Sequence, residues 1–303
     1  MSHPFSITFW GVRGSYPAPG ALTARVGGNT PSLEVKAGKH HLILDAGTGA
    51  IVLGRAMVEQ ARAAQTPIVA TLLFTHTHHD HTQGFPFFTP THYQSTRLYV
   101  FGPKTLEQDL EEVLSRAMLP PVFPITLDEL PCLRVMRNLQ EGEVIVLNPD
   151  ESEPHVVFDR DAVLHDSPDI VRVRVLSSHA HPQGVFIYRI EYGGKAIVYA
   201  TDTEGYVGGD QRLIQFARGA DLLIHDAQYT EAEYSADSMP KQGWGHSTWP
   251  MAVAVARAAG VKQLALFHHD PLHSDDMLEQ LEKQAQSSFA QTVLAREGMT
   301  IDL

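Results

Sequence analysis

The chain has 303 residues, of which 43% are hydrophobic and 19% charged, with a formal net charge of −12. This composition is typical of a globular protein, and the acidic balance argues against a large nucleic-acid-binding face, which needs basic residues. The single cysteine, Cys132, excludes an intramolecular disulfide and a thiolate-rich zinc site. Because no apolar run approaches the ~20 residues that span a bilayer and no export signal is evident, we expect a cytoplasmic protein without a membrane partner.

The first quarter of the sequence alternates short apolar runs with turn residues, which predicts strands followed by one helix. Apolar residues at helical spacing indicate the helix. The predicted elements are strands at 7–12, 32–36 and 41–44, a helix at 50–64 and a strand at 68–74.

The last of these strands leads into the sequence FTHTHHDH, which has the spacing His-x-His-x-Asp-His. From one short turn, His76 and His78 can bind one divalent ion, while Asp80 and His81 bind a second. Imidazole and carboxylate together suit zinc, with manganese or iron as substitutes. A polar surface turn would explain a single histidine, but this density and spacing favour a metal site.

Beyond this motif, we predict a strand at 97–101 and a helix at 105–118. The range 119–167 is rich in proline and acidic residues and shows no regular pattern. We interpret it as an insertion of short strands and loops within a single domain that spans 1–303. In that position, 119–167 would form a lid over the site or a dimer contact.

Regular patterns return in the second half of the chain. The predicted strands are 170–176, 185–192, 195–200, 222–225 and 263–267, and the predicted helices are 211–217, 248–259 and 274–287. A Gly193-Gly194 turn joins the second and third of these strands as a hairpin. The pattern predicts an α/β protein with two sheets covered by helices and with its site at strand ends.

Three further segments place polar residues directly after apolar strands. They are 177–184 with His179 and His181, 200–203 with Asp202, and 266–270 with His268 and His269. The residues alone leave open whether His179 or His181 binds a metal. We interpret His179, His225 and His269 as loop or supporting residues rather than ligands.

Together these motifs resemble the metallo-β-lactamase superfamily, and the resemblance covers nearly the whole chain. The motif that begins at His76 looks like the superfamily signature. Asp45 looks like its upstream structural aspartate, and Asp202 looks like its bridging carboxylate. The resemblance implies a four-layer αββα sandwich of two mixed β-sheets flanked by helices.

Within the superfamily, the chain is most similar to the phosphodiesterase branch, which includes ribonuclease Z and bacterial cyclic-nucleotide phosphodiesterase-like proteins. That branch has a histidine seven residues before a Tyr-Arg-Ile strand, a pattern that His181 matches. The Gly-His-Ser-Thr element around His246 resembles one that supplies a catalytic histidine which is not a ligand. The His-Asp-Ala element around Asp226 resembles one whose acid orients that histidine, with aspartate here in place of the branch's glutamate.

The resemblance implies two divalent metal ions. The implied ligands are His76, His78, His181 and Asp202 for the first ion, and Asp80, His81, Asp202 and His268 for the second. Asp80 would orient or deprotonate a hydroxide that bridges the ions. His246, held by Asp226, would stabilise the transition state or protonate the leaving alkoxide.

The predicted function is therefore metal-dependent hydrolysis of a small phosphodiester, such as a cyclic nucleotide or a nucleotide-like substrate, by a homodimer. A ribonuclease Z-type tRNA 3′ endonuclease is the first alternative, although the acidic charge and the lack of an obvious long basic arm do not favour a nucleic-acid partner. The fold also hosts lactone and thioester hydrolases. A metal-bound sensing module without turnover is the remaining alternative.

Overall fold

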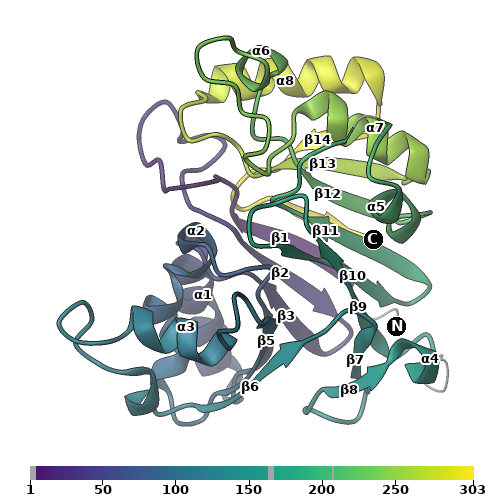
Figure 1. Ribbon diagram of the computed structural model, residues 1–303. Helices are drawn as coiled ribbons and strands as arrows, with labels where there is room; N and C mark the ends of the chain where they lie inside the picture. The colour runs from purple at the N-terminus through teal and green to yellow at the C-terminus, as the bar shows by residue number, and fades with distance from the viewer. Residues whose placement is uncertain (1–4, 163–166, 207) are drawn as a thin grey trace.

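The structure is a computed structural model that describes residues 5–162, 167–206 and 208–303 (Figure 1). Its strands form two sheets that pack face to face. In spatial order, the first sheet contains β15 (Thr300–Asp302), β1 (Phe5–Gly11), β2 (Ser32–Ala37), β3 (His40–Leu44), β4 (Val69–Leu73), β5 (Arg97–Pro103) and β6 (Leu133–Leu139). The second contains β14 (Thr292–Leu294), β13 (Gln263–Phe267), β12 (Leu222–Asp226), β11 (Lys195–Ala200), β10 (Val185–Tyr192), β9 (Val171–Ser178), β7 (Glu143–Leu147) and β8 (His155–Phe158).

Helices cover the outer faces of both sheets (Figure 1). The helices of the described residues are α1 (Gly49–Ala64), α2 (His79–Thr82), α3 (Leu110–Ala117), α4 (Asp159–Ala162), α5 (Gln211–Phe216), α6 (Glu231–Tyr234), α7 (Trp249–Ala259) and α8 (Asp275–Ser288), with 3₁₀ turns η1 (Phe85–Phe87), η2 (Thr89–His92) and η3 (Leu127–Glu129). Within the described ranges, no helix is long and apolar enough to cross a membrane. The layers confirm the predicted αββα architecture.

Alternating side chains on the strands build two apolar layers, because successive residues of a strand point to opposite faces. In β4, Leu73 lies in the layer between the sheets, whereas Leu72 packs in the layer that α1 and α3 cover. Tyr99 and Val100 of β5 alternate in the same way. The apolar runs predicted as strands are therefore buried on both faces, which is why they are nearly continuous.

Parallel pairing in both sheets determines where the site lies. β3, β4 and β5 run parallel in the first sheet, and β11, β12 and β13 run parallel in the second. Their carboxyl ends therefore meet at one edge of each sheet. The polar segments that follow these strands gather at this edge, as is general for α/β proteins.

Most predicted elements are confirmed within about two residues, but the helix predicted at 105–118 is wrong in its first third. The helix α3 begins at Leu110. Leu106 and Glu107 have φ angles of 47° and 63°. This left-handed conformation cannot continue a right-handed helix, so 105–109 forms a turn instead.

The range 119–167 contributes strands to both sheets. β6 lies at the edge of the first sheet, whereas β7 and β8 lie at the edge of the second. The range thus carries the chain from one sheet to the other, and the Val-Ile-Val run of β7 is a strand signal that its proline-rich surroundings obscured. Its role as a lid or dimer contact stays a prediction.

One buried hydrogen bond joins the two sheets beside the predicted metal motif. The Tyr188 hydroxyl on β10 donates to the Phe74 carbonyl at 2.6 Å. Tyr188→Phe leaves this buried acceptor without that donor, so we expect the free energy of unfolding to fall by about 1–3 kcal/mol in chemical denaturation. Tyr192→Phe is the matched control on the same face of β10, because its hydroxyl has no hydrogen bond to a described residue. An equal loss in both variants would contradict this assignment.

Candidate metal centre

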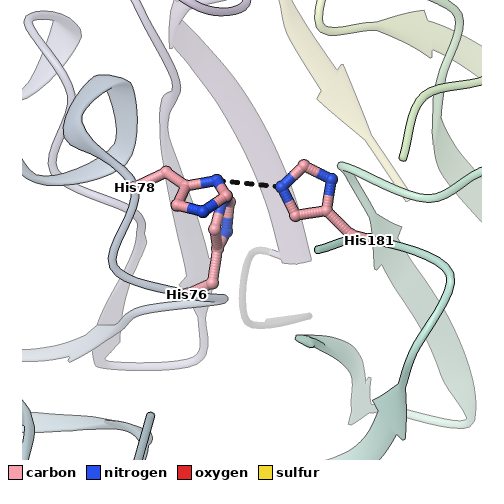
Figure 2. Close-up of side chains that lie close together, drawn as sticks. All are labelled: His76, His78 and His181. Atoms are coloured by element: carbon pink, nitrogen blue, oxygen red, sulfur yellow. Dashed lines mark hydrogen bonds between the residues drawn. The ribbon is translucent and has the colours of Figure 1, made fainter. Parts of the chain in front are cut away.

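The seven predicted ligands come together where the two sheets meet. One ligand atom from each member lies within 4.8 Å of the others in two groups, which are His76, His78 and His181, and Asp80, His81, Asp202 and His268. Figure 2 shows that His76 and His78 approach from the turn after β4, whereas His181 approaches from the loop after β9. The Nδ1 atom of His78 lies 2.9 Å from the Nε2 atom of His181.

Asp202 lies between the two groups. Its Oδ1 atom is 3.1 Å from His81 Nε2 and 3.3 Å from His268 Nε2. Its Oδ2 atom is 3.7 Å from His76 Nε2 and 3.8 Å from His181 Nε2. One carboxylate therefore faces both sets of imidazoles, as a bridging ligand would.

The outward nitrogens of three histidines in the centre are hydrogen-bonded to acceptors. Nδ1 of His81 lies 2.9 Å from an Asp45 oxygen, and Nδ1 of His268 lies 2.9 Å from the Gln228 amide oxygen. Nδ1 of His181 lies 3.1 Å from the Gly245 carbonyl oxygen. Because these partners are acceptors, each Nδ1 carries a proton, and in the neutral ring Nε2 then presents a lone pair to the centre.

The other two histidines follow the same rule. Nε2 of His78 donates to the Gln183 amide oxygen at 2.8 Å, so its Nδ1 is the inward atom. The Thr75 hydroxyl donates to Asp45 and can therefore accept from Nδ1 of His76 at 3.0 Å. This leaves Nε2 of His76 as the inward atom.

These inward atoms fit divalent metal ions. Nε2 of His76 is buried without a hydrogen-bond partner. Nδ1 of His78 and Nε2 of His181 lie 2.9 Å apart, at hydrogen-bond distance. In the neutral tautomers that Gln183 and Gly245 favour, both atoms have a lone pair, so a shared proton or a metal ion is needed to hold them together. Five nitrogen lone pairs and two carboxylates constitute the donor set that zinc prefers, divided here into two groups.

Burial and neighbouring charges together set the protonation of these side chains. Burial opposes protonation of His81, but the carboxylates of Asp202, Asp80 and Asp45 raise its pKa well above the usual range, so this ring loses a proton when it binds metal. Burial lowers the pKa of His76, and it lowers the pKa of His181 to about 4, so both rings are neutral near pH 7. Burial alone would raise the pKa of Asp202, but the neighbouring His268 and His81 hold it well below the usual range. Neutral imidazole and ionised carboxylate are the forms that bind metal.

A second buried pair lies beside the predicted ligands. Nδ1 of His246 lies 2.8 Å from Asp226 Oδ2, and the His246 ring stacks on His268 with the ring centres 5.0 Å apart. Backbone N–H groups of Gln228 and Ser247 donate to the other Asp226 oxygen. Burial opposes protonation of His246, but the charge of Asp226 outweighs it and raises the pKa to about 9, an effect that nearby metal ions would oppose.

Comparison with known proteins identifies the family. The profile described as "Beta-lactamase superfamily domain" matches residues 40–269. The chain belongs to the metallo-β-lactamase superfamily. Among curated relatives, ribonuclease Z of Thermoplasma acidophilum is 27% identical over 95% of this chain and 94% of the relative.

Solved structures of the superfamily share the fold. The metallo-β-lactamase fold protein YhfI of Bacillus subtilis has a TM-score of 0.64 at 20% identity and covers 99% of this chain and all of its own. A diphosphatase of the PhnP family has a TM-score of 0.65 at 17% identity, over 99% of this chain and 98% of the other. At these identities, the likeness shows the fold alone.

The histidines that we interpret from the sequence as loop or supporting residues belong to neither group of predicted ligands. His179 is exposed, whereas His225 bonds the Asp226 carbonyl and His269 bonds the Ala295 carbonyl. No sequence pattern predicts that Gln183 and Gln228 orient ligands, because each meets its histidine only in the folded chain. His246 can also form groups with His181 and Asp202, or with Asp226 and His268, so metal analysis of a His246 variant bears on its role.

We predict two metal ions per chain, measured by elemental analysis after purification without chelator. Asp202→Ala removes the carboxylate that faces both groups, so we expect both ions to be depleted. His268→Ala removes a side chain of one group, so we expect about one ion to remain. Circular dichroism verifies that each variant is folded.

Full metal content in folded Asp202→Ala would contradict the assignment of Asp202 as the shared ligand. His155→Ala is the matched control for the loss of an imidazole, because His155 lies exposed on β8.

Proposed function

We propose that this metallo-β-lactamase superfamily hydrolase cleaves the phosphodiester bond of a small cyclic or nucleotide-like substrate. The observation that carries the proposal is the buried Asp226–His246 pair, which directly adjoins the His268 side of the metal centre. Hydrolysis of a phosphodiester releases an alkoxide, which needs a proton. A sensing module without turnover needs no such donor.

Two bound divalent ions, which we propose to be zinc with manganese or iron as substitutes, would supply Lewis acidity and lower the pKa of an attacking water. The proposed ligands are the two groups described above. Asp80 has a further role in the proposal. Its Oδ2 accepts the Ser15 backbone N–H at 2.7 Å, which fixes the carboxylate so that it can orient the attacking water and accept its proton.

His246 is the proposed proton donor. The Nδ1–H group of His246 donates a hydrogen bond to Asp226, so the opposite nitrogen, Nε2, is left to give its proton to the leaving oxygen. The same hydrogen bond keeps the ring in one orientation and stabilises its charged form. This arrangement is the usual requirement for a general acid held by a carboxylate.

A cavity of about 590 Å³ beside the metal centre suits a substrate of nucleotide size. It is lined by the predicted ligand His181 together with Gln183, Glu204 and Tyr206. Small-molecule sites commonly enclose about 300–1,000 Å³. A cavity of this size can hold a nucleotide-sized substrate without contacts to the rest of the protein surface.

Ribonuclease Z-type cleavage of precursor tRNA is the second candidate. The curated relative from Thermoplasma acidophilum carries that name and matches nearly the full length of both chains. Against it stands the net charge of −12, since binding of many phosphates needs a basic face.

A homodimer, with 119–167 as a lid or subunit contact, completes the proposal and is tested by sedimentation of the full chain and of a chain with a shortened 119–126 loop.

A substrate panel distinguishes the candidates. Purified protein loaded with zinc, manganese or iron is offered bis-p-nitrophenyl phosphate, 2′,3′- and 3′,5′-cyclic nucleotides, precursor tRNA, a lactone and a thioester. We expect the highest kcat/KM with a cyclic or small nucleotide substrate. Preference for precursor tRNA would establish the second candidate, and activity only on the lactone or thioester would refute phosphodiester hydrolysis.

For His246→Ala, we predict that both metal ions and the fold are retained but that turnover falls about 10²- to 10⁴-fold with an alkoxide leaving group. With a p-nitrophenoxide leaving group the loss shrinks, because this phenolate departs without a proton. Steady-state kinetics with both kinds of substrate measure the difference.

Equal losses on the two kinds of substrate would mean that His246 positions the phosphate instead of donating a proton. Loss of a metal ion in His246→Ala would make it a ligand and overturn the proposed roles.

A further inference from the structure

The loop before α7 contacts the metal centre at two successive residues. The Gly245 carbonyl accepts a hydrogen bond from Nδ1 of His181, and the next residue, His246, pairs with Asp226. The shape of this loop therefore determines both the direction of a predicted ligand and the position of the proposed proton donor. Regular secondary structure does not hold the loop, which spans 241–247 between α6 and α7.

Glu204 holds this loop through its side chain. The backbone N–H of Gly243 donates to both Glu204 oxygens, at 2.8 and 2.9 Å, and the backbone N–H of Gly245 donates to Oε2 at 3.0 Å. The Tyr234 hydroxyl donates to Oε1 at 2.5 Å. The backbone N–H of Glu204 also bonds the Ala180 carbonyl, which ties the same residue to the loop that carries His181.

The loop packs tightly against His181 at Gly245. Gly245 has a φ of +86°, and a Cβ atom at this position would lie 2.2 Å from Nδ1 of His181. Gly243 has a φ of +80°. Both glycines adopt a left-handed conformation that other residues disfavour. Because glycine populates other conformations as readily, a fixed acceptor such as Glu204 selects this one.

We propose that Glu204 is a positioning residue that sets the loop 241–247, and through it orients His181 and His246. The orientation of His181 affects metal binding. The orientation of His246 affects proton donation, and this part rests on the proposed function. A carboxylate suits this place because all of its hydrogen-bonding partners are donors and it has only acceptor atoms. An amide at the same position would turn an NH₂ group toward the backbone N–H of Gly243 or Gly245.

Glu204→Gln in the metal-loaded protein tests this proposal, because the two side chains have nearly the same shape. We expect faster hydrogen–deuterium exchange in the peptide that contains 241–247. We also expect metal affinity and kcat to fall about 10- to 100-fold, the usual effect of losing a group that orients a ligand. KM for a small substrate should change less than kcat, because Glu204 lines the proposed cavity but its oxygens are hydrogen-bonded to the loop. The loss in kcat should be greater with an alkoxide than with a p-nitrophenoxide leaving group.

Two further variants make the result specific. Glu231→Gln is the matched control, since Glu231 is exposed on α6 beside the same loop, and its exchange, metal affinity and kcat should equal those of the original protein. Glu204→Asp keeps two acceptor oxygens on a side chain one methylene shorter, so we expect intermediate losses. It also provides the same measurements if Glu204→Gln fails to fold.

Unchanged exchange and metal affinity in Glu204→Gln would overturn the proposal. So would a loss of kcat that is equal for both leaving groups together with unchanged metal affinity, which would indicate a purely structural role. If the original protein cleaves no phosphodiester, the proposed function fails, but exchange and metal affinity still decide whether Glu204 sets the loop.

Discussion

The site depends on one electrostatic constraint, which is the convergence of five imidazole lone pairs and two carboxylates in a buried space. Each histidine gives its outward N–H to a fixed acceptor, such as Asp45 for His81, Gln228 for His268 and Gly245 for His181. In the neutral rings the inward nitrogens then have lone pairs and no protons with which to bond one another. Protons or metal ions stabilise such an arrangement, so we expect metal binding and the final packing of the site to be coupled.

The two sheets bring this donor set together, and some backbone strain accompanies it. Asp45, Asp202 and His268 each follow a strand end with a left-handed φ, of 58°, 49° and 60° respectively. Non-glycine residues in this conformation cost on the order of 1 kcal/mol or more and are concentrated at functional sites. The strand ends from both sheets are thereby turned toward one seam, where Asp202 faces both groups of histidines.

The sequence predicts which side chains gather because their motifs are local. His76 to His81 lie in one turn, and Asp202 and His268 each follow an apolar strand that is easy to recognise. The supporting contacts were not predictable in this way, since Gln183, Gln228 and Glu204 meet their partners only through the packing of distant segments. The early turn before α3 was missed, and the short strands expected within 119–167 were not assigned to residues, because left-handed residues and edge strands leave weak sequence patterns.

The most direct test of the account is the structure of the metal-loaded protein, with anomalous scattering measured at the metal absorption edge. Two peaks are predicted, one bound by His76, His78 and His181 and the other by Asp80, His81 and His268, with one oxygen of Asp202 bound to each. His246 should contact neither ion and should keep its hydrogen bond to Asp226. A single peak, or a peak bound by His246, would contradict the account.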